Sequence, residues 1–135
     1  MIVSLMAAAL LANTPSVPDQ IDTARADWSR FDSLEVRDVV LPTESMVGHV
    51  QGILERGECE LPRQRAERFD IDVNYAILLD DQGNATRIAV EDLGCRPLEL
   101  YVGRVARKIV EEGHVRVTPR GEPRWYASRI NFNLQ

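Results

Sequence analysis

The sequence predicts a single α+β domain in which an antiparallel three-stranded sheet, built as a hairpin, a helix and a third strand, carries helices packed on one face. Three observations support this fold class. Apolar and polar residues alternate along 69–79 and again along 125–134, as in strands with one buried face. A glycine-containing turn at 80–84 joins the first of these strands to a returning one. Apolar residues recur at helical spacing in 43–56 and 97–110.

The segment 43–56 is predicted to form the first helix. Thr43 or Ser45 can cap its first turn, and Gly57 can end it, because glycine readily adopts the left-handed conformation that often follows a helix. Its apolar residues fall on one stripe: Met46, Val47, Val50, Ile53 and Leu54. We expect this stripe to pack on the sheet.

The hairpin has the most regular pattern in the chain. Its first strand, 69–79, places apolar side chains on one face and polar side chains on the other. The turn at 80–84 reads DDQGN, and its Gly83 can supply the positive φ that such turns require. The returning strand, 86–91, alternates in the same way, so both strands are expected to bury one face.

A second helix and a last strand complete the predicted sheet. Pro97 can open the helix, where its missing N–H costs nothing, and Gly113 can end it. The core-facing residues of this helix are Leu98, Val102, Val105 and Ile109. After a short extended piece at 115–118, the last strand places its apolar residues on one face: Tyr126, Ile130, Phe132 and Leu134.

The N-terminal residues predict export. Residues 1–16 are predicted to be a secretory signal peptide, because Ile2–Ala12 is an uncharged apolar run that suits the hydrophobic region of such a signal. The run is too short for a membrane span, which needs about 20 residues. A buried N-terminal helix and a short uncleaved anchor are the alternatives. Residues 17–42 would form an N-terminal extension to the domain at 43–135. Within the extension, three residues have helical spacing: Ile21, Ala24 and Trp28.

Cys59 and Cys95 are the only cysteines, and we predict that they form a disulfide. An even cysteine count is typical of exported proteins, and the compartment predicted here is the periplasm. In the loop-entropy description, a bridge over this separation stabilises the folded state by about 3.8 kcal/mol. Two buried free thiols or half of a metal site are the alternatives. His49 and His114, the only histidines, lack the spacing of zinc ligands.

The net charge of −5 is unevenly distributed. Residues 1–95 hold 8 basic and 17 acidic side chains, whereas residues 96–135 hold 8 basic and 4 acidic ones. A nucleic-acid-binding domain normally has a basic excess overall, so no nucleic-acid partner is predicted. The asymmetry indicates either two solvated faces or a basic surface near the C-terminus that meets an acidic partner.

No catalytic, cofactor-binding or metal-binding residues are predicted, and the protein is expected not to be an enzyme. Ser45 and His49 lie four residues apart on a helix, but no nucleophile-elbow motif surrounds the serine. Asp70 and Asp72 share the polar side of a strand, where we expect them to face Arg87 or Arg129 across the sheet. The segment 80–84 lacks the glycine position and the closing glutamate of a calcium loop, which favours a plain turn.

From about residue 60 to residue 134, the order of turns, strands and helix resembles the C-terminal domain of the TonB family. The segments that carry the resemblance are, in chain order, Leu61-Pro62, the hairpin 72–90, the helix 97–110, Val115–Pro119, Gly121–Pro123 and Ile130–Leu134. Val115–Pro119 keeps the spacing of the family's W-x-F-x-P segment, with valine in place of both aromatic residues. Gly121–Pro123 matches its G-x-P turn.

The resemblance implies a periplasmic module that binds a peptide or an envelope protein by adding it as a strand to a sheet edge. The candidate edge is the last strand, with these residues: Trp125, Ala127, Arg129, Asn131 and Asn133. Trp125 could instead cover a seam against the N-terminal segment. In that family, TonB itself is a membrane-anchored rod with a proline-rich spacer. This chain shows neither an adequate span nor a spacer, so energy transduction is not expected. The alternatives are an accessory envelope protein that reuses the fold and a hydrolase whose site has no recognisable motif.

Overall fold

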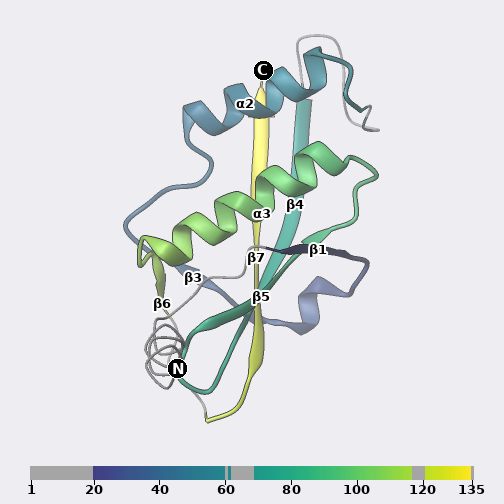
Figure 1. The fold of residues 1–135 in the computed structure, drawn as a ribbon. Coiled ribbons are helices and arrows are strands. Elements are labelled where there is room, and N and C mark those ends of the chain that lie inside the picture. The colour runs from purple at the N-terminus through teal and green to yellow at the C-terminus, as the bar shows by residue number, and fades with distance from the viewer. Residues whose placement is uncertain (1–19, 60, 62–68, 117–120, 135) are drawn as a thin grey trace, which may run out of the picture.

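The computed structural model describes residues 20–59, 61, 69–116 and 121–134 (Figure 1). The predicted signal peptide, residues 1–16, lies outside these residues. The described chain forms a five-stranded sheet with the order β1-β5-β4-β7-β2, a separate two-stranded sheet of β3 and β6, and two α-helices. The helices α2 and α3 contact each other and pack on strands of the large sheet.

The centre of the large sheet is antiparallel. β4 (Phe69–Leu79) and β5 (Ala85–Glu91) form the predicted hairpin, and Gly83 in its turn has a φ of 84°. β7 (Arg124–Leu134) pairs with β4 along its whole length, from Phe69 beside Leu134 to Leu79 beside Arg124. The alternating patterns in the sequence therefore predicted these three strands correctly.

The predicted three-stranded antiparallel sheet is nevertheless wrong, because two further strands make the sheet mixed. β1 (Ile21–Ala24) runs parallel to β5 at one edge, and β2 (Asp32–Ser33) runs parallel to β7 at the other. Strands this short carry too few residues to show an alternating pattern. The helical spacing of the apolar residues near the N-terminus was misleading, since they belong to β1 and to a short 3-10 helix, Trp28–Arg30. These strands come from the segment predicted as an N-terminal extension, 17–42.

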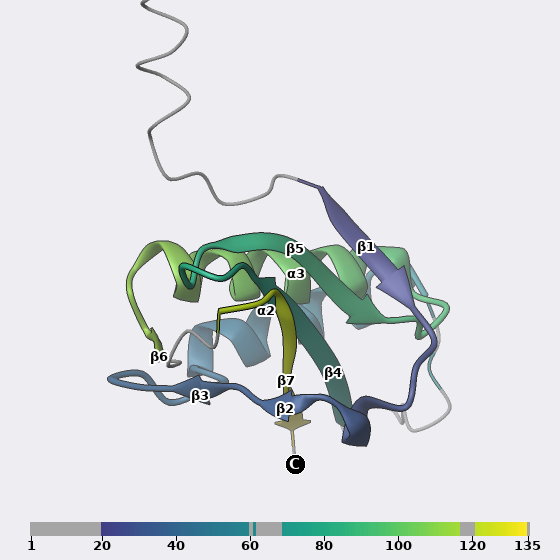
Figure 2. The ribbon, with the colours of Figure 1, turned by 90° about the horizontal axis from the view of Figure 1, so that it is seen from below.

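The connection between β1 and β2, residues 25–31, has to cross the sheet from one edge to the other (Figure 2). Four strand spacings amount to roughly 19 Å, which this connection can span when extended. The helices cover one face, so the connection crosses the opposite one. Trp28, Phe31 and Trp125 meet there, with ring centroids 5.8 Å apart for the first pair and 6.2 Å apart for the second. Ala76, at the middle of β4 on that face, is fully buried.

The two helices begin as the sequence predicts. α2 (Glu44–Glu55) is capped by Thr43, whose Oγ1 accepts a hydrogen bond from the Met46 N–H at 3.2 Å. α3 (Arg96–Glu111) carries Pro97 in its first turn. β3 (Glu35–Val36) and β6 (Val115–Arg116) form the small antiparallel sheet. The core combines the apolar stripes of both helices with the helix-facing residues of the sheet, among them Val50, Leu98, Val102, Tyr75, Ile77 and Phe132.

Gly103 of α3 permits the close approach of β1, which leads to a testable prediction. A Cβ atom at this position would lie 2.5 Å from Cδ1 and 2.8 Å from Cγ1 of Ile21. Gly103→Ala should therefore overpack this contact and lower the free energy of unfolding by about 1–3 kcal/mol, measured by urea denaturation.

Gly48 of α2 is the matched control, because a Cβ there would meet nothing within 4 Å. Gly48→Ala should stabilise the protein by roughly 0.5–1 kcal/mol through helix propensity. If both substitutions stabilised the protein equally, the packing of β1 on α3 would be contradicted.

Candidate functional site

The candidate site is one edge of β7, and the backbone pairing of this edge differs along its length. β4 occupies the other edge of β7 completely. On the candidate edge, β2 pairs only with Tyr126 and Ala127, and the Leu34 N–H donates a hydrogen bond to the Ala127 carbonyl at 2.8 Å. Within the described residues, no strand pairs with the remainder of this edge, 128–133. The edge is therefore closed at its first part and open at its second.

The direction of the backbone groups on the open part follows from the pairing at Ala127. In a strand, the N–H and C=O of one residue point to the same edge, and those of the next residue point to the opposite edge. The Ala127 carbonyl points to the edge shared with β2. Arg129, Asn131 and Asn133 follow at intervals of two, so their N–H and C=O groups also point to that edge.

The five predicted edge residues are divided by β2. Ala127 pairs with β2, Trp125 lies just before the paired residues, and the other three lie in the open part. Trp125 contacts Phe31 of the N-terminal segment, and the Arg87 guanidinium lies 5.6 Å from the centre of its ring. The interpretation of Trp125 as the cover of a seam is therefore confirmed.

The side chains of the open part give it a polar surface. Asn131 Nδ2 donates hydrogen bonds to Asp70 at 2.7 Å and to Asp72 at 2.9 Å. Of the two arginines expected to face these aspartates, Arg87 pairs instead with Asp22 at 3.0 Å, and Arg129 lies beside Asn74 of β4. Arg129 is exposed and forms no ion pair with any residue that the structure describes.

A hollow of about 500 Å³ lies beside the part of β4 that extends beyond β5, and Arg129 is the residue that β7 contributes to its lining. Its lining combines four carboxylates with one arginine and a few apolar side chains: Leu61, Asp70, Ile71, Asp72, Asn74, Glu91, Asp92, Leu93 and Arg129. It forms where β5 ends while β4 continues. The Glu91 carboxylate there accepts hydrogen bonds from the Asn74 backbone N–H at 3.1 Å and from Asn74 Nδ2 at 3.0 Å. The hollow is acidic and open, so it suits a basic side chain.

The two histidines, His49 and His114, lie in separate surroundings. His49 stacks on Tyr101 with ring centroids 4.0 Å apart. His114 faces two acceptors: its Nδ1 lies 2.9 Å from the Arg37 carbonyl, and its Nε2 lies 3.3 Å from Glu112. Across residues 20–59, 61, 69–116 and 121–134, no three His, Cys, Asp or Glu side chains are grouped to hold a metal ion.

Asp80 belongs to the hairpin turn, as the sequence predicts. Hydrogen bonds from the backbone N–H groups of Asn84 and Gln82 lower the pKa of its carboxyl group, the bond from Asn84 contributing most. The two donors lie 2.8 Å and 2.9 Å from Oδ1. The carboxylate therefore fixes the turn in place rather than serving as a proton donor.

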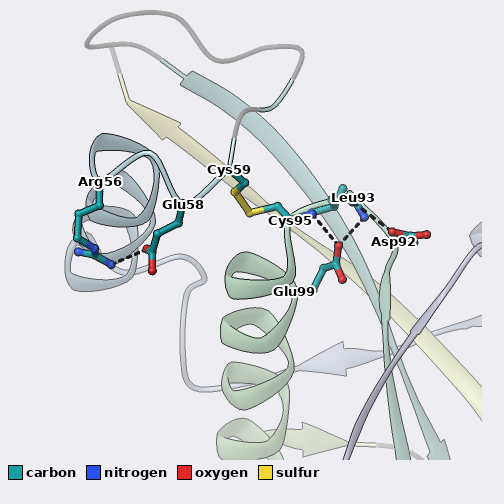
Figure 3. The surroundings of a disulfide bond; sticks show 8 residues. Arg56, Glu58, Cys59, Asp92, Leu93, Cys95 and Glu99 are labelled. Atoms are coloured by element: carbon teal, nitrogen blue, oxygen red, sulfur yellow. Dashed lines mark hydrogen bonds and ion pairs between the residues drawn. A yellow bond between two sulfur atoms is a disulfide. The ribbon is translucent and has the colours of Figure 1, made fainter.

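The predicted disulfide is confirmed: Cys59 and Cys95 are bonded, with Cα atoms 5.5 Å apart (Figure 3). The bond ties the chain after α2 to the start of α3. Beside it lies Glu99, whose carboxylate accepts hydrogen bonds from the N–H groups of Leu93 at 2.9 Å and Cys95 at 3.0 Å. Glu99 is only 3% exposed. Sequence reasoning missed this residue, and its position in the first turn of a helix was the available signal.

None of the helices in the described part of the chain has the length and apolar character needed to cross a membrane. Comparison of the chain with protein-family models, with curated proteins and with solved structures finds no match.

Proposed function

We propose that this protein is a non-enzymatic periplasmic module that binds an extended segment of a peptide or envelope protein by adding it as a strand to the open part of β7. One observation carries the proposal: residues 128–133 lie on a sheet edge with no paired strand among the described residues. Exposed edges of this kind are templates for strand addition.

The backbone groups define what the partner must supply. Arg129, Asn131 and Asn133 each offer one N–H and one C=O to an incoming strand. A hydrogen bond of this type contributes about 0.5–1.5 kcal/mol net, so backbone pairing alone would give weak binding. Side chains must then provide the selectivity. Arg129 favours an acidic residue beside it, since opposite charges on neighbouring strands attract.

The open part is also short and polar, which limits unwanted pairing. Polar and charged side chains on an edge strand discourage aggregation between identical edges. Asn131 is held by Asp70 and Asp72, and Arg129 is exposed. A partner with a matching pattern can bind such an edge, whereas a second copy of the same edge gains little from it.

The periplasmic location rests on three supports. The disulfide is compatible with an exported protein. The apolar run at residues 2–12 predicts a secretory signal. The resemblance to the TonB C-terminal domain, which remains a proposal, points to the same compartment and to the same kind of strand addition. Energy transduction is not part of the proposal.

A second candidate is an accessory envelope protein that reuses the fold without binding a strand. The pairing of β2 with Tyr126 and Ala127 favours it, because the N-terminal segment already closes part of the edge. The two candidates differ in whether residues 128–133 accept a partner.

The test replaces Asn131, whose N–H points to the open edge. Asn131→Pro removes this N–H and places a ring on the edge without breaking the β4–β7 hydrogen bonds, because proline is tolerated on edge strands. Asn131→Ala is the matched control: it also loses the bonds to Asp70 and Asp72 but keeps the backbone N–H. Wild-type protein and both variants, disulfide intact, are immobilised and incubated with a cell-envelope extract.

Bound proteins are quantified by mass spectrometry, and thermal melts confirm that each variant is folded. We expect the proline variant to lose the captured partners and the alanine variant to retain them. Equal capture by all three proteins would contradict strand addition at this edge and leave the accessory role as the better candidate.

A further inference from the structure

A second hollow lies within the helical layer, and no sequence motif pointed to it. It has a volume of about 440 Å³ and lies between α2, α3 and the segment that leads into α2. Its lining includes Val39, Leu41, Met46, Val105 and Ile109. This hollow, called the helix groove below, is separate from the open edge of β7, so the inference drawn from it does not depend on the proposed function.

The rim of the helix groove is basic on its α3 side. Arg104 and Lys108 lie one helical turn apart, and both are exposed. Arg104 forms no ion pair with a described residue, and the Lys108 ammonium reaches the Glu112 carboxylate only at 3.9 Å. Glu112 also lies near His114. The rim thus holds two cations and one carboxylate, and Arg104 is available to an anionic group.

Tyr101 adds a hydrogen-bond donor to this lining. Burial raises the pKa of its phenol, so the hydroxyl stays protonated at neutral pH. The ring is held in place by stacking on His49. The lining thus joins an apolar side to a polar and charged one, and a volume of this size is typical of sites for small molecules.

We infer that the helix groove binds a small anionic amphiphile: a hydrocarbon body that packs against the apolar lining and one acidic head group held by Arg104 and Lys108. The charges decide the sign of the head group, because a cationic head would meet the same two side chains unfavourably. The volume limits the ligand to a small molecule.

The test compares two probes of equal chain length and opposite charge. Dodecanoate and dodecyltrimethylammonium are titrated into the disulfide-bonded protein at neutral pH, below the concentrations at which they form micelles, and binding is measured by calorimetry. We expect saturable binding of dodecanoate with one molecule per chain, and binding of the cationic probe that is weaker by about 10-fold or more. Equal affinity for both probes, or no saturable binding of dodecanoate, would overturn the inference.

Charge-neutral variants locate the site. Arg104→Gln with Lys108→Gln should weaken dodecanoate binding by about 3- to 10-fold, as expected for two solvent-exposed charges. Arg96→Gln with Arg107→Gln is the matched control, because it removes the same net charge from the same helix outside the groove. Binding that falls equally in both double variants would show an effect of net charge and not of this site.

Amide chemical shifts of the wild-type protein give an independent readout that does not rely on any variant. On addition of dodecanoate, the largest changes should fall on Val39, Leu41 and Tyr101. Changes centred on β7 instead would place the amphiphile elsewhere and reject the helix groove as its site.

Discussion

Loss of the Cys59–Cys95 disulfide is expected to lower the free energy of unfolding by about 3–4 kcal/mol. The two cysteines are 36 residues apart in sequence, and the bond removes the entropy of a long loop from the unfolded chain. This is a large part of the 5–15 kcal/mol that stabilises a typical domain. Urea denaturation with and without a phosphine reductant would measure the change.

A variant with Cys59→Ala and Cys95→Ala separates the bond from other effects of the reductant. Alanine suits position 95 because that side chain is buried among apolar neighbours. The double variant should match the reduced wild-type protein in stability to within about 1 kcal/mol, and the reductant should not change it further. If reduction left the urea midpoint unchanged, the bond would not be a major source of stability.

Replacement of Glu99 by alanine is expected to cost about 3 kcal/mol or more, although no motif marks this residue. Its carboxylate accepts two backbone hydrogen bonds in a position that is almost fully buried. A hydrogen bond to a charged group contributes roughly 1.5–3 kcal/mol, and each orphaned N–H adds a desolvation cost. Leu93 and Cys95, which supply the donors, shape the loop that enters α3.

Two variants serve as controls: Glu99→Gln is a conservative substitution at the same site, and Glu111→Ala removes an exposed carboxylate from the same helix. Glutamine keeps a carbonyl oxygen that can accept the same bonds, so its cost should be smaller, about 1–2 kcal/mol. Glu111 lies exposed at the end of the same helix, and its replacement should change stability by less than about 0.5 kcal/mol. Equal effects for Glu99→Ala and Glu111→Ala would contradict the role assigned to the buried carboxylate.

The two predictions concern one structural unit, because Cys95 takes part in both (Figure 3). Groups that share a contact usually have non-additive effects on stability. We therefore expect the cost of Glu99→Ala to be smaller once the disulfide is reduced, since the loop before α3 is then less firmly held. A double-mutant cycle in urea would measure this coupling.

The elements that bury one face over many residues could be predicted from the sequence alone. β4, β7 and the two helices bury long apolar stripes, and a period of two or 3.6 residues is visible when an element is long enough. The disulfide also followed from the sequence, because two cysteines in a chain predicted to be exported have only each other as partners.

The edges of the sheet, in contrast, could be recognised only from the tertiary structure. β1 and β2 are held by backbone pairing with β5 and β7, and backbone hydrogen bonds leave no pattern in the side chains. For this reason the sequence could propose β7 as a binding edge but could not show that Asp32 and Ser33 close part of it. The burial of Glu99 likewise depends on which loop folds over the start of α3. The open part of β7 and the helix groove are formed by segments that lie far apart in the sequence. A local sequence pattern carries no information about which distant segments contact each other.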